Sequence, residues 1–196
     1  MLTLFHAPYS RSSTILWLLE ELEQPYDLVL IDIRAEGGAP ESYRATHPHK
    51  KVPAVALDGT IITERAAIAT YLCDRFPEKG LAPAPSDPDR APYLSWLVYC
   101  DAVLDPAIAT KAKAWTYAPA EFSFGSFEDM SRHVERTLSS RPFAAGERFT
   151  AADVLLGSSL RWVRHAFGYF DAPVFDAYLA RVTDRPGFHR YRTIEG

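Results

Sequence analysis

The sequence lacks the features that would tie it to a membrane or to nucleic acid. It contains no run of about eighteen apolar residues, so we expect no membrane-spanning helix. Its formal net charge is -4, whereas nucleic-acid surfaces are basic. The first ten residues have no basic segment followed by a long apolar run, so we expect no secretory signal. We therefore predict a protein with no membrane or nucleic-acid partner.

Cysteine is also scarce. Cys73 and Cys100 are the only two cysteines, and they lie in helical patterns without CxxC or metal-ligand spacing. We predict that both are buried packing residues in a reducing cytoplasm, and that the protein holds no metal. The sequence also has no internal repeat, low-complexity tract or glycine-rich phosphate loop. The sequence therefore gives no sign of a repeat protein, a low-complexity protein or a protein with a phosphate-binding loop.

The first part of the chain alternates strand and helix signals. Residues 2–6 predict a strand, and residues 10–22 a helix with apolar side chains at helical spacing. Residues 26–31 are apolar almost throughout, as expected for a strand buried on both faces. A strand, a helix and a strand with a short link predict a right-handed parallel crossover. Residues 41–46 add at most two helical turns.

A proline turn, a hairpin and a helix follow in order. Val52-Pro53 is an X-Pro bond, the only kind that becomes cis at modest cost. Asp58-Gly59 is a strong two-residue turn, which predicts a hairpin formed by residues 54–57 and 60–62. Thr63 is a candidate N-cap for the next helix. That helix opens with two charged residues and carries apolar positions at helical spacing: Glu64, Arg65, Ile68, Tyr71 and Leu72.

The remainder of the chain predicts helices only. Residues 77–92 carry five prolines, which indicates a stiff linker. Residues 93–113 predict a long helix that Pro106 bends or interrupts. Its expected inward positions are apolar: Leu94, Leu97, Val98, Val103, Leu104 and Ile108. Further helices are expected at 127–138, after a cap at Thr150 with Asp153 three residues on, at 174–182 and at 186–191.

This order resembles the glutathione transferase family, in its soluble bacterial type with a serine in the first turn. The resemblance rests on Val52-Pro53 before two strands, on Glu64 at the head of a helix, and on the Phe149–Asp153 capping segment. It implies an α/β thioredoxin-like domain over residues 1–77, a linker over 78–92 and an all-helical domain over 93–196. It also implies a cytoplasmic homodimer.

The resemblance implies that glutathione is a co-substrate whose thiolate attacks a small apolar electrophile. A free thiol has a pKa of about 8.5, so the protein must stabilise the thiolate. Ser10, next to the N-terminus of the first helix, is the preferred hydrogen-bond donor. Ser12 and Ser13 are rival donors, and Tyr9 fits better as a wall of the substrate pocket. An ordinary N-cap is the plainer interpretation of Ser10.

The resemblance also assigns contacts to the rest of glutathione. Glu64 would accept the ammonium of the γ-glutamyl end, and Arg65 would hold its carboxylate through the backbone N–H or the guanidinium. Val52 would pair its backbone with the cysteinyl part, and Pro53 in cis would turn that edge outward. Lys51 would bind the glycyl carboxylate. Simple helix-favouring, turn and solvent-facing roles are the alternatives for these residues.

Two other functions stay open at this point. Arg65 stands where the family usually has serine, and Lys50 also departs from its pattern, which favours a binding or interaction protein without activity. A glutathione-dependent isomerase or peroxidase is the other alternative. The first turn holds no cysteine, so members that form mixed disulfides with glutathione match poorly. Four aromatic residues are candidates for the electrophile pocket between the domains: Tyr9, Tyr99, Trp115 and Phe167.

Overall fold

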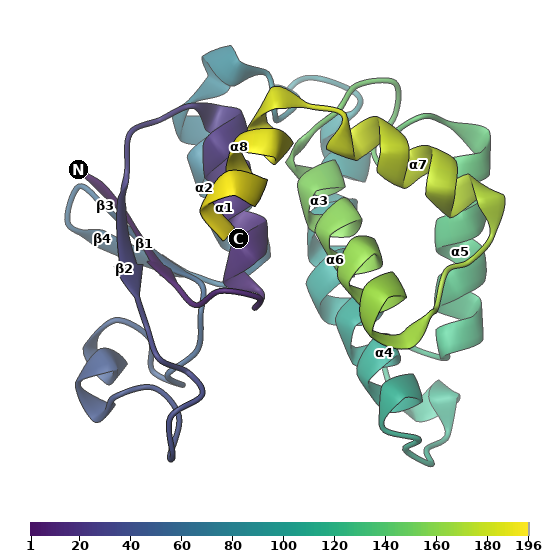
Figure 1. Ribbon diagram of the computed structural model, residues 1–196. Coiled ribbons are helices and arrows are strands. Elements are labelled where there is room, and N and C mark those ends of the chain that lie inside the picture. The colour runs from purple at the N-terminus through teal and green to yellow at the C-terminus, as the bar shows by residue number, and fades with distance from the viewer. Residues whose placement is uncertain (196) are drawn as a thin grey trace. The chain divides into compact units, whose positions relative to one another are not determined.

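The computed structural model describes residues 1–195, which form two compact units. The first comprises residues 1–79 together with the segment that begins at Arg185, and the second comprises residues 80–184. The first unit combines a sheet with helices, and the second is built from helices (Figure 1). The predicted fold class, a thioredoxin-like α/β domain followed by an all-helical one, is confirmed.

The sheet of the first unit has four strands in the order β2-β1-β3-β4. The strands are β1 (Leu2–His6), β2 (Asp27–Leu30), β3 (Ala54–Leu57) and β4 (Thr60–Thr63). β1 pairs in parallel with β2, while β1–β3 and β3–β4 are antiparallel. The predicted parallel crossover and hairpin are therefore both present. Asp58 and Gly59 take positive φ values of 51° and 84°, as a tight hairpin turn requires.

β2 differs from the prediction. It was expected to be buried on both faces, but all four of its side chains are exposed, and Leu30 is 65% exposed. The reason is its place in the sheet, since β2 is an edge strand with one neighbour. An apolar run alone does not distinguish an edge strand from a central one.

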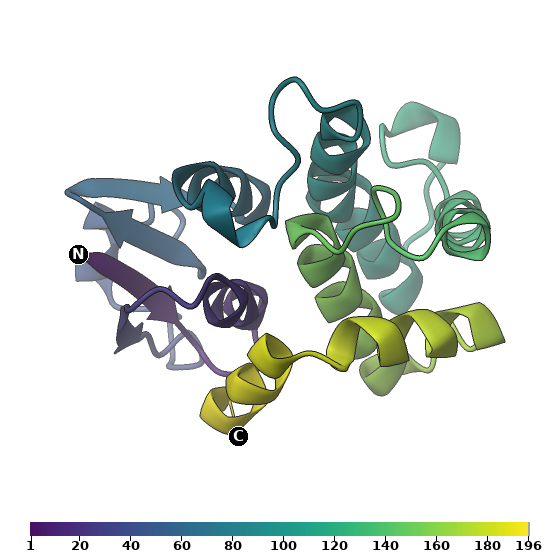
Figure 2. The same ribbon diagram turned by 90° about the horizontal axis from the view of Figure 1, so that it is seen from above.

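Three helices cover one face of this sheet (Figures 1 and 2). They are α1 (Ser12–Leu22), α2 (Arg65–Arg75) and α8 (Pro186–Glu195). The short 3-10 segments η1 (Glu41–Ala45) and η2 (Pro77–Lys79) complete the unit. α1 lies at the centre of the core, and its apolar side chains are fully buried: Ile15, Leu16, Leu18, Leu19 and Leu22.

The last helix belongs to the first unit, whereas the domain prediction placed its residues in the helical domain. α8 packs along α1, where Trp17 meets the edge of Phe188 at 5.0 Å and stacks on Tyr191 at 6.2 Å between ring centroids. The Arg185 guanidinium donates twice to the Glu21 carboxylate, at 2.9 and 3.0 Å. These contacts return the end of the chain to the sheet domain.

The start of α2 also differs in detail from the prediction. Thr63 is the last residue of β4 rather than the N-cap, and Glu64 occupies the cap position. Ile68 and Leu72 are buried as expected, but Tyr71 is 41% exposed. The hairpin therefore runs directly into the helix, with a single residue between them.

The second unit contains five α-helices and two short irregular segments within residues 80–184. These are α3 (Arg90–Tyr99), the π-helical η3 (Cys100–Leu104), α4 (Asp105–Ala112), the 3-10 segment η4 (Pro119–Glu121), α5 (Phe127–Ser140), α6 (Ala151–Phe167) and α7 (Pro173–Thr183). Cys100, in η3, is a buried thiol, as is Cys73 in the first unit.

The predicted interruption at Pro106 takes the form of a π-turn. Proline has no N–H to donate to the carbonyl four residues earlier, so an α-helix loses a bond there. Just before Pro106 the helix contains a π-helical turn, in which the Asp105 N–H donates to the carbonyl of Cys100, five residues earlier. Of the six positions predicted to face inward, Leu97, Leu104 and Ile108 are buried and Val103 is half-buried. The other two are wrong. Leu94 and Val98 are 37% and 57% exposed.

The predicted cap of α6 is present. Thr150 and Asp153 form a capping box, and Asp153 is fully buried. Its carboxylate accepts hydrogen bonds from the Ala144 N–H at 2.7 Å and the Tyr178 hydroxyl at 3.0 Å. Burial raises the pKa of Asp153 to about 6, and the hydrogen bonds from Ala144, Thr150 and Tyr178 oppose that rise.

Candidate active site

The turn between β1 and α1 places Ser10 beside the N-terminus of a helix. Tyr9 has a φ of 56°, which turns the chain out of the strand, and α1 begins at Ser12 with Arg11 at the cap position. The Ser13 N–H donates to the Ser10 carbonyl at 3.1 Å. The backbone N–H groups of this first turn give the region a positive potential.

The hydroxyl of Ser10 lies within a set of short polar contacts. Its Oγ is 2.7 Å from the Ala7 carbonyl oxygen and 2.8 Å from the Oγ of Ser12. It also accepts a hydrogen bond from the Ser12 N–H at 3.2 Å. The Arg11 side chain makes no capping bond, whereas Ser10 accepts the backbone N–H bond that the N-cap interpretation expects.

Ser10 lines a pocket of about 250 Å³ in the first unit. The pocket brings together three of the residues chosen from the sequence: Ser10, Lys51 and Val52. Its remaining lining residues come from the turn after β1 and from two loops: Arg11, Ile33, Gly37, Gly38, Ala39, His49 and Lys50. Ser10, Lys51 and Val52 thus line one space.

The charge of this pocket is positive. Arg11, Lys50 and Lys51 line it, and no carboxylate does so within the described residues. The Lys50 ammonium is already held by the Gly37 carbonyl at 3.2 Å and lies 3.4 Å from Glu41. Lys51 has an exposed side chain. The pocket is therefore suited to a ligand with a carboxylate.

The loop before β3 has the predicted conformation, because the Val52-Pro53 peptide bond is cis. Val52 and Pro53 are both buried. The Val52 side chain packs in a small apolar cluster with Ala7, Ala39 and Tyr43. This packing fixes the backbone of Val52 at the pocket wall.

Glu64 and Arg65 do not line the pocket within residues 1–195, and they differ in exposure. Glu64 is exposed and has a φ of 68° with a ψ of 124°, a conformation that non-glycine residues rarely adopt. Burial lowers the pKa of His47, and the charge of Glu64 opposes that shift. The Arg65 side chain is only 4% exposed. The strained backbone of Glu64 is of a kind that is concentrated at functional sites.

The three other hydroxyl candidates of this turn are Tyr9, Ser12 and Ser13. Ser13 is buried, and its hydroxyl donates to the Glu195 carboxylate. The Tyr9 side chain is 65% exposed and is not among the lining residues described above. Ser12 is fully buried, so its hydroxyl is removed from the pocket surface. Ser10 is thus the hydroxyl of this turn that meets the pocket directly.

Sequence reasoning missed two buried residues behind the serines. The His6 ring lies 2.8 Å from Ser12 through Nδ1 and 3.2 Å from the Glu195 carboxylate through Nε2. Glu195 also accepts hydrogen bonds from the Tyr9 N–H at 2.6 Å and from the Ser13 hydroxyl. The alternation of Leu2, Leu4 and His6 on one face of β1 was a signal that this histidine is buried. The sequence carried no comparable signal for Glu195.

The Glu195 carboxylate is charged despite its burial. Desolvation raises its pKa, but hydrogen bonds from His6, Ser13 and the Tyr9 N–H outweigh that effect and lower the pKa below its ordinary value. A buried carboxylate with these donors holds the last helix against the first turn.

A second candidate pocket lies within the helical unit. Trp115 is 64% exposed and, with Tyr117 and Phe127, lines a hollow of about 390 Å³ near the end of α4. Among the other aromatic candidates, Tyr99 packs on Trp96 and His133, and Phe167 packs on Trp162 and Tyr169. Trp115 is the candidate that lines this hollow.

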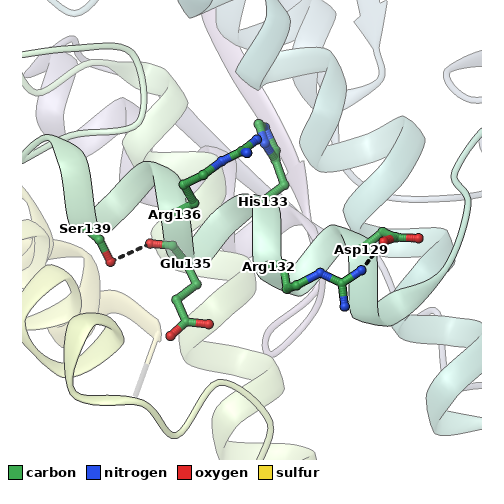
Figure 3. A pocket seen from close by; sticks show the side chains of 6 residues that line it. All are labelled: Asp129, Arg132, His133, Glu135, Arg136 and Ser139. Carbon is green, nitrogen blue, oxygen red and sulfur yellow. Dashed lines mark hydrogen bonds and ion pairs between the residues drawn. The ribbon is translucent and has the colours of Figure 1, made fainter.

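A larger hollow of about 550 Å³ runs along α5, but it has the character of a solvated helix face (Figure 3). Arg132 is paired with Asp129, and the Ser139 hydroxyl donates to the Glu135 carbonyl at 2.8 Å. This surface thus has one ion pair and one hydrogen bond within α5 itself, and most of its side chains are exposed.

Within residues 1–195, no group of three or more His, Cys, Asp or Glu side chains is arranged to hold a metal ion. In the same part of the chain, no helix has both the length and the apolar character needed to cross a membrane.

The fold and the site define a two-unit protein with a thioredoxin-like sheet, a serine turn and a cis-proline loop. The family description "Glutathione S-transferase, N-terminal domain" matches residues 4–80, and "Glutathione S-transferase, C-terminal domain" matches residues 106–193. Glutathione S-transferase 3 of Schizosaccharomyces pombe is 32% identical over 175 residues, which cover 78% of this chain and 70% of that protein. The chain belongs to the glutathione S-transferase family.

Bacterial relatives cover almost the whole chain. Glutathione S-transferase GstA of Escherichia coli O157:H7 is 29% identical over 98% of each chain. The structure of a sphingomonad glutathione S-transferase complexed with glutathione superimposes with a TM-score of 0.79, at 28% identity, over 99% of this chain and 98% of that one. A glutathione transferase from Methylococcus capsulatus gives a TM-score of 0.83 at 26% identity, over 100% and 99% of the two chains. The predicted family is confirmed.

Proposed function

We propose that this protein is a glutathione transferase that joins the glutathione thiolate to a small apolar electrophile. The observation that carries the proposal is the position of Ser10. Its hydroxyl lies at the N-terminal side of α1 and lines a cationic pocket beside the cis Val52-Pro53 bond. A hydrogen-bond donor and the positive end of a helix both favour a thiolate over a thiol.

The energy available from Ser10 is sufficient for this role. A hydrogen bond to a charged group contributes about 1.5–3 kcal/mol. One pKa unit corresponds to about 1.4 kcal/mol, so Ser10 lowers the pKa of the bound thiol by about one to two units. That shift supplies a useful fraction of thiolate at neutral pH.

The pocket supports specific contacts for the rest of glutathione. Lys51 binds the glycyl carboxylate, because Lys50 is engaged by Gly37 and Glu41. The backbone of Val52 pairs with the cysteinyl part. Glu64 accepts the γ-glutamyl ammonium. The Arg65 side chain is buried, so its backbone N–H is the better candidate for the γ-glutamyl carboxylate.

The electrophile is proposed to bind the hollow lined by Trp115, Tyr117 and Phe127. Its aromatic walls suit an apolar molecule. The Lys111 ammonium lies 5.3 Å from the centroid of the Phe127 ring and is paired with the Glu128 carboxylate at 3.0 Å, so the edge of this hollow carries a neutralised ion pair.

We also propose a cytoplasmic homodimer. Both cysteines are buried thiols, which suits a reducing compartment. Each unit exposes large apolar side chains that a partner subunit would cover: Ile61 and Tyr71 in the first, and Leu94 and Val98 in the second. Sedimentation equilibrium tests the dimer, and a monomer at all concentrations would rule it out.

Enzyme assays test the proposed activity. Purified protein is mixed with glutathione and a panel of aryl halides, enones and hydroperoxides. Conjugation of the first two groups supports the transferase. Turnover of hydroperoxides alone would assign the protein to the peroxidase alternative, and binding of glutathione without turnover would assign it to the non-catalytic alternative.

A further inference from the structure

A row of two hydrogen bonds and one ion-pair contact leads from the proposed glutathione pocket to a buried carboxylate. Ser10, at the pocket, contacts Ser12 with 2.8 Å between their Oγ atoms. Ser12 Oγ lies 2.8 Å from His6 Nδ1, and His6 Nε2 lies 3.2 Å from Glu195 Oε2. His6 and Ser12 are 2% and 0% exposed, so water does not interrupt the row at either.

We propose that His6 accepts the proton that bound glutathione loses, through Ser12 and Ser10, and that Glu195 holds the resulting imidazolium. This inference rests on the proposed function, because it names the proton acceptor for the same thiol. His6 and Glu195 touch no ligand, so they act as positioning and proton-storing residues behind Ser10.

The direction of each hydrogen bond follows from the carboxylate. An ionised carboxylate only accepts, so His6 Nε2 carries a proton that it donates to Glu195. In the neutral ring, Nδ1 is then an acceptor, and the Ser12 hydroxyl donates to it. Ser12 Oγ in turn accepts from the Ala7 N–H at 3.0 Å and is within reach of the Ser10 hydroxyl. The Ala7 carbonyl is the alternative acceptor for both hydroxyls, at 2.7 Å from Ser10 Oγ and 3.1 Å from Ser12 Oγ, and the transfer requires each hydroxyl to turn from it toward the next group in the row. The hydroxyls can thus both point inward, away from the pocket.

The transfer conserves every proton. The thiol proton passes to Ser10 Oγ while Ser10 gives its own proton to Ser12, and Ser12 gives its proton to His6 Nδ1. The S–H bond breaks and an N–H bond forms. The products are a thiolate, two neutral serines and an imidazolium that faces a carboxylate. Ser10 now carries the proton that came from sulfur, and it donates that proton to the thiolate as a hydrogen bond.

The surroundings of His6 favour this outcome. The ionisable group that faces the ring is Glu195 of α8, while α1 presents the Ser12 hydroxyl. A buried cation is costly unless it is paired, and a charged carboxylate is already in contact with Nε2. Glu195 is fixed by the Tyr9 N–H and the Ser13 hydroxyl, so it does not need to move to receive the charge.

A proton inventory on the full chain tests the proposal. Glutathione is titrated by calorimetry at neutral pH in buffers with different ionisation enthalpies, and thiolate absorbance is recorded on the same samples. We expect thiolate to form with no proton released to the buffer. Nitrogen NMR of the labelled histidines should show the His6 ring become doubly protonated with glutathione and stay neutral with S-methylglutathione, which has no thiol proton.

Variants separate the relay from a structural role. His6→Gln keeps hydrogen-bonding groups but cannot be protonated near neutral pH. Ser12→Ala removes the hydroxyl that links Ser10 to His6. In each, we expect the pKa of the bound thiol to rise by about one unit, a tenfold loss of thiolate near neutral pH. Thr70→Ala is the control, because this hydroxyl bonds only within its own helix, to the Ala66 carbonyl at 2.8 Å.

The outcomes distinguish this proposal from the proposed function. Stoichiometric proton release to the buffer with a neutral His6 ring would overturn the relay alone, because thiolate would still form. Absence of glutathione binding or of any thiolate would overturn both. An unchanged thiol pKa in His6→Gln and Ser12→Ala would also exclude the relay.

Discussion

Glu195 accepts a hydrogen bond from the Tyr9 N–H at 2.6 Å, across 186 positions of the chain. This contact ties the last helix to the turn that carries Ser10. The same carboxylate faces His6, so the end of the chain influences both the shape and the charge of the site. Five predictions follow from this arrangement and from the two pockets.

Removal of the Ser10 hydroxyl should raise the pKa of the bound thiol. In Ser10→Ala we expect a rise of about one to two units, since the thiolate loses one charged hydrogen bond. The rate of conjugation near neutral pH should fall by about tenfold or more. Absorbance of the glutathione complex across pH provides the measurement, with Thr70→Ala as the control. An unchanged thiol pKa would show that another group holds the sulfur.

Glu64 combines a strained backbone with a proposed binding role, and two substitutions separate these. In Glu64→Gln the strain stays and the charge is lost, so glutathione affinity should fall by about tenfold or more while stability is unchanged. In Glu64→Gly the affinity should fall similarly, but relief of the positive φ should stabilise the fold by about 1 kcal/mol. Calorimetry and urea unfolding measure the two effects. Full affinity in both variants would remove Glu64 from the site.

Gly187 allows α8 to approach α1 closely. A Cβ at this position would lie 3.0 Å from the Glu21 Cα and 2.6 Å from its carboxyl carbon. Gly187→Ala should therefore destabilise the protein by about 1–3 kcal/mol. Thr193→Ala, an exposed position on the same helix, should change stability by less than about 0.5 kcal/mol. Equal stabilities by urea unfolding would mean that the two helices are not tightly docked.

The lowered pKa of Glu195 predicts a pH dependence of stability. A carboxyl whose folded pKa lies below its unfolded value stabilises the folded state above the unfolded pKa, which is 4.5 for this group. That stabilisation disappears as the pH falls through the folded pKa. The stability difference between the wild type and Glu195→Gln should thus be largest near neutral pH and shrink in acid. A difference that grows in acid would contradict the direction of the shift.

We expect the Trp115 side chain to contact the bound electrophile and not glutathione. In Trp115→Ala the KM for an aromatic electrophile should rise by about tenfold, because a large apolar contact is lost. The KM for glutathione and the pKa of the bound thiol should stay at wild-type values. Trp162→Ala, another partly exposed tryptophan, is the matched control. Equal effects of the two substitutions would move the electrophile elsewhere.

Local sequence signals predicted the elements that depend on local chemistry. The hairpin at Asp58-Gly59 and the capping box of Thr150 and Asp153 each follow from the residues at those positions, whereas the cis bond at Val52-Pro53 was expected from the family resemblance. Family resemblance then supplied the fold class of each unit, a thioredoxin-like sheet domain followed by a helical one. Ser10, Lys51 and Val52 were chosen on that basis and share one pocket in the structure.

Features that depend on residues far apart in the chain could not be predicted from the sequence. The apolar run of β2 gave no sign that it lies at an edge, because edge position is a property of the whole sheet. Leu94 and Val98 fit a helical stripe but lie outside the core. The contacts of His6 and Glu195 join opposite ends of the chain, and no spacing rule connects such residues.

Titration of the purified protein with glutathione, followed by thiolate absorbance of the complex across pH, tests the proposed function most directly. We predict binding with a bound-thiol pKa about one to two units below that of free glutathione. Absence of binding at millimolar glutathione, or a bound thiol with the pKa of the free one, would contradict it.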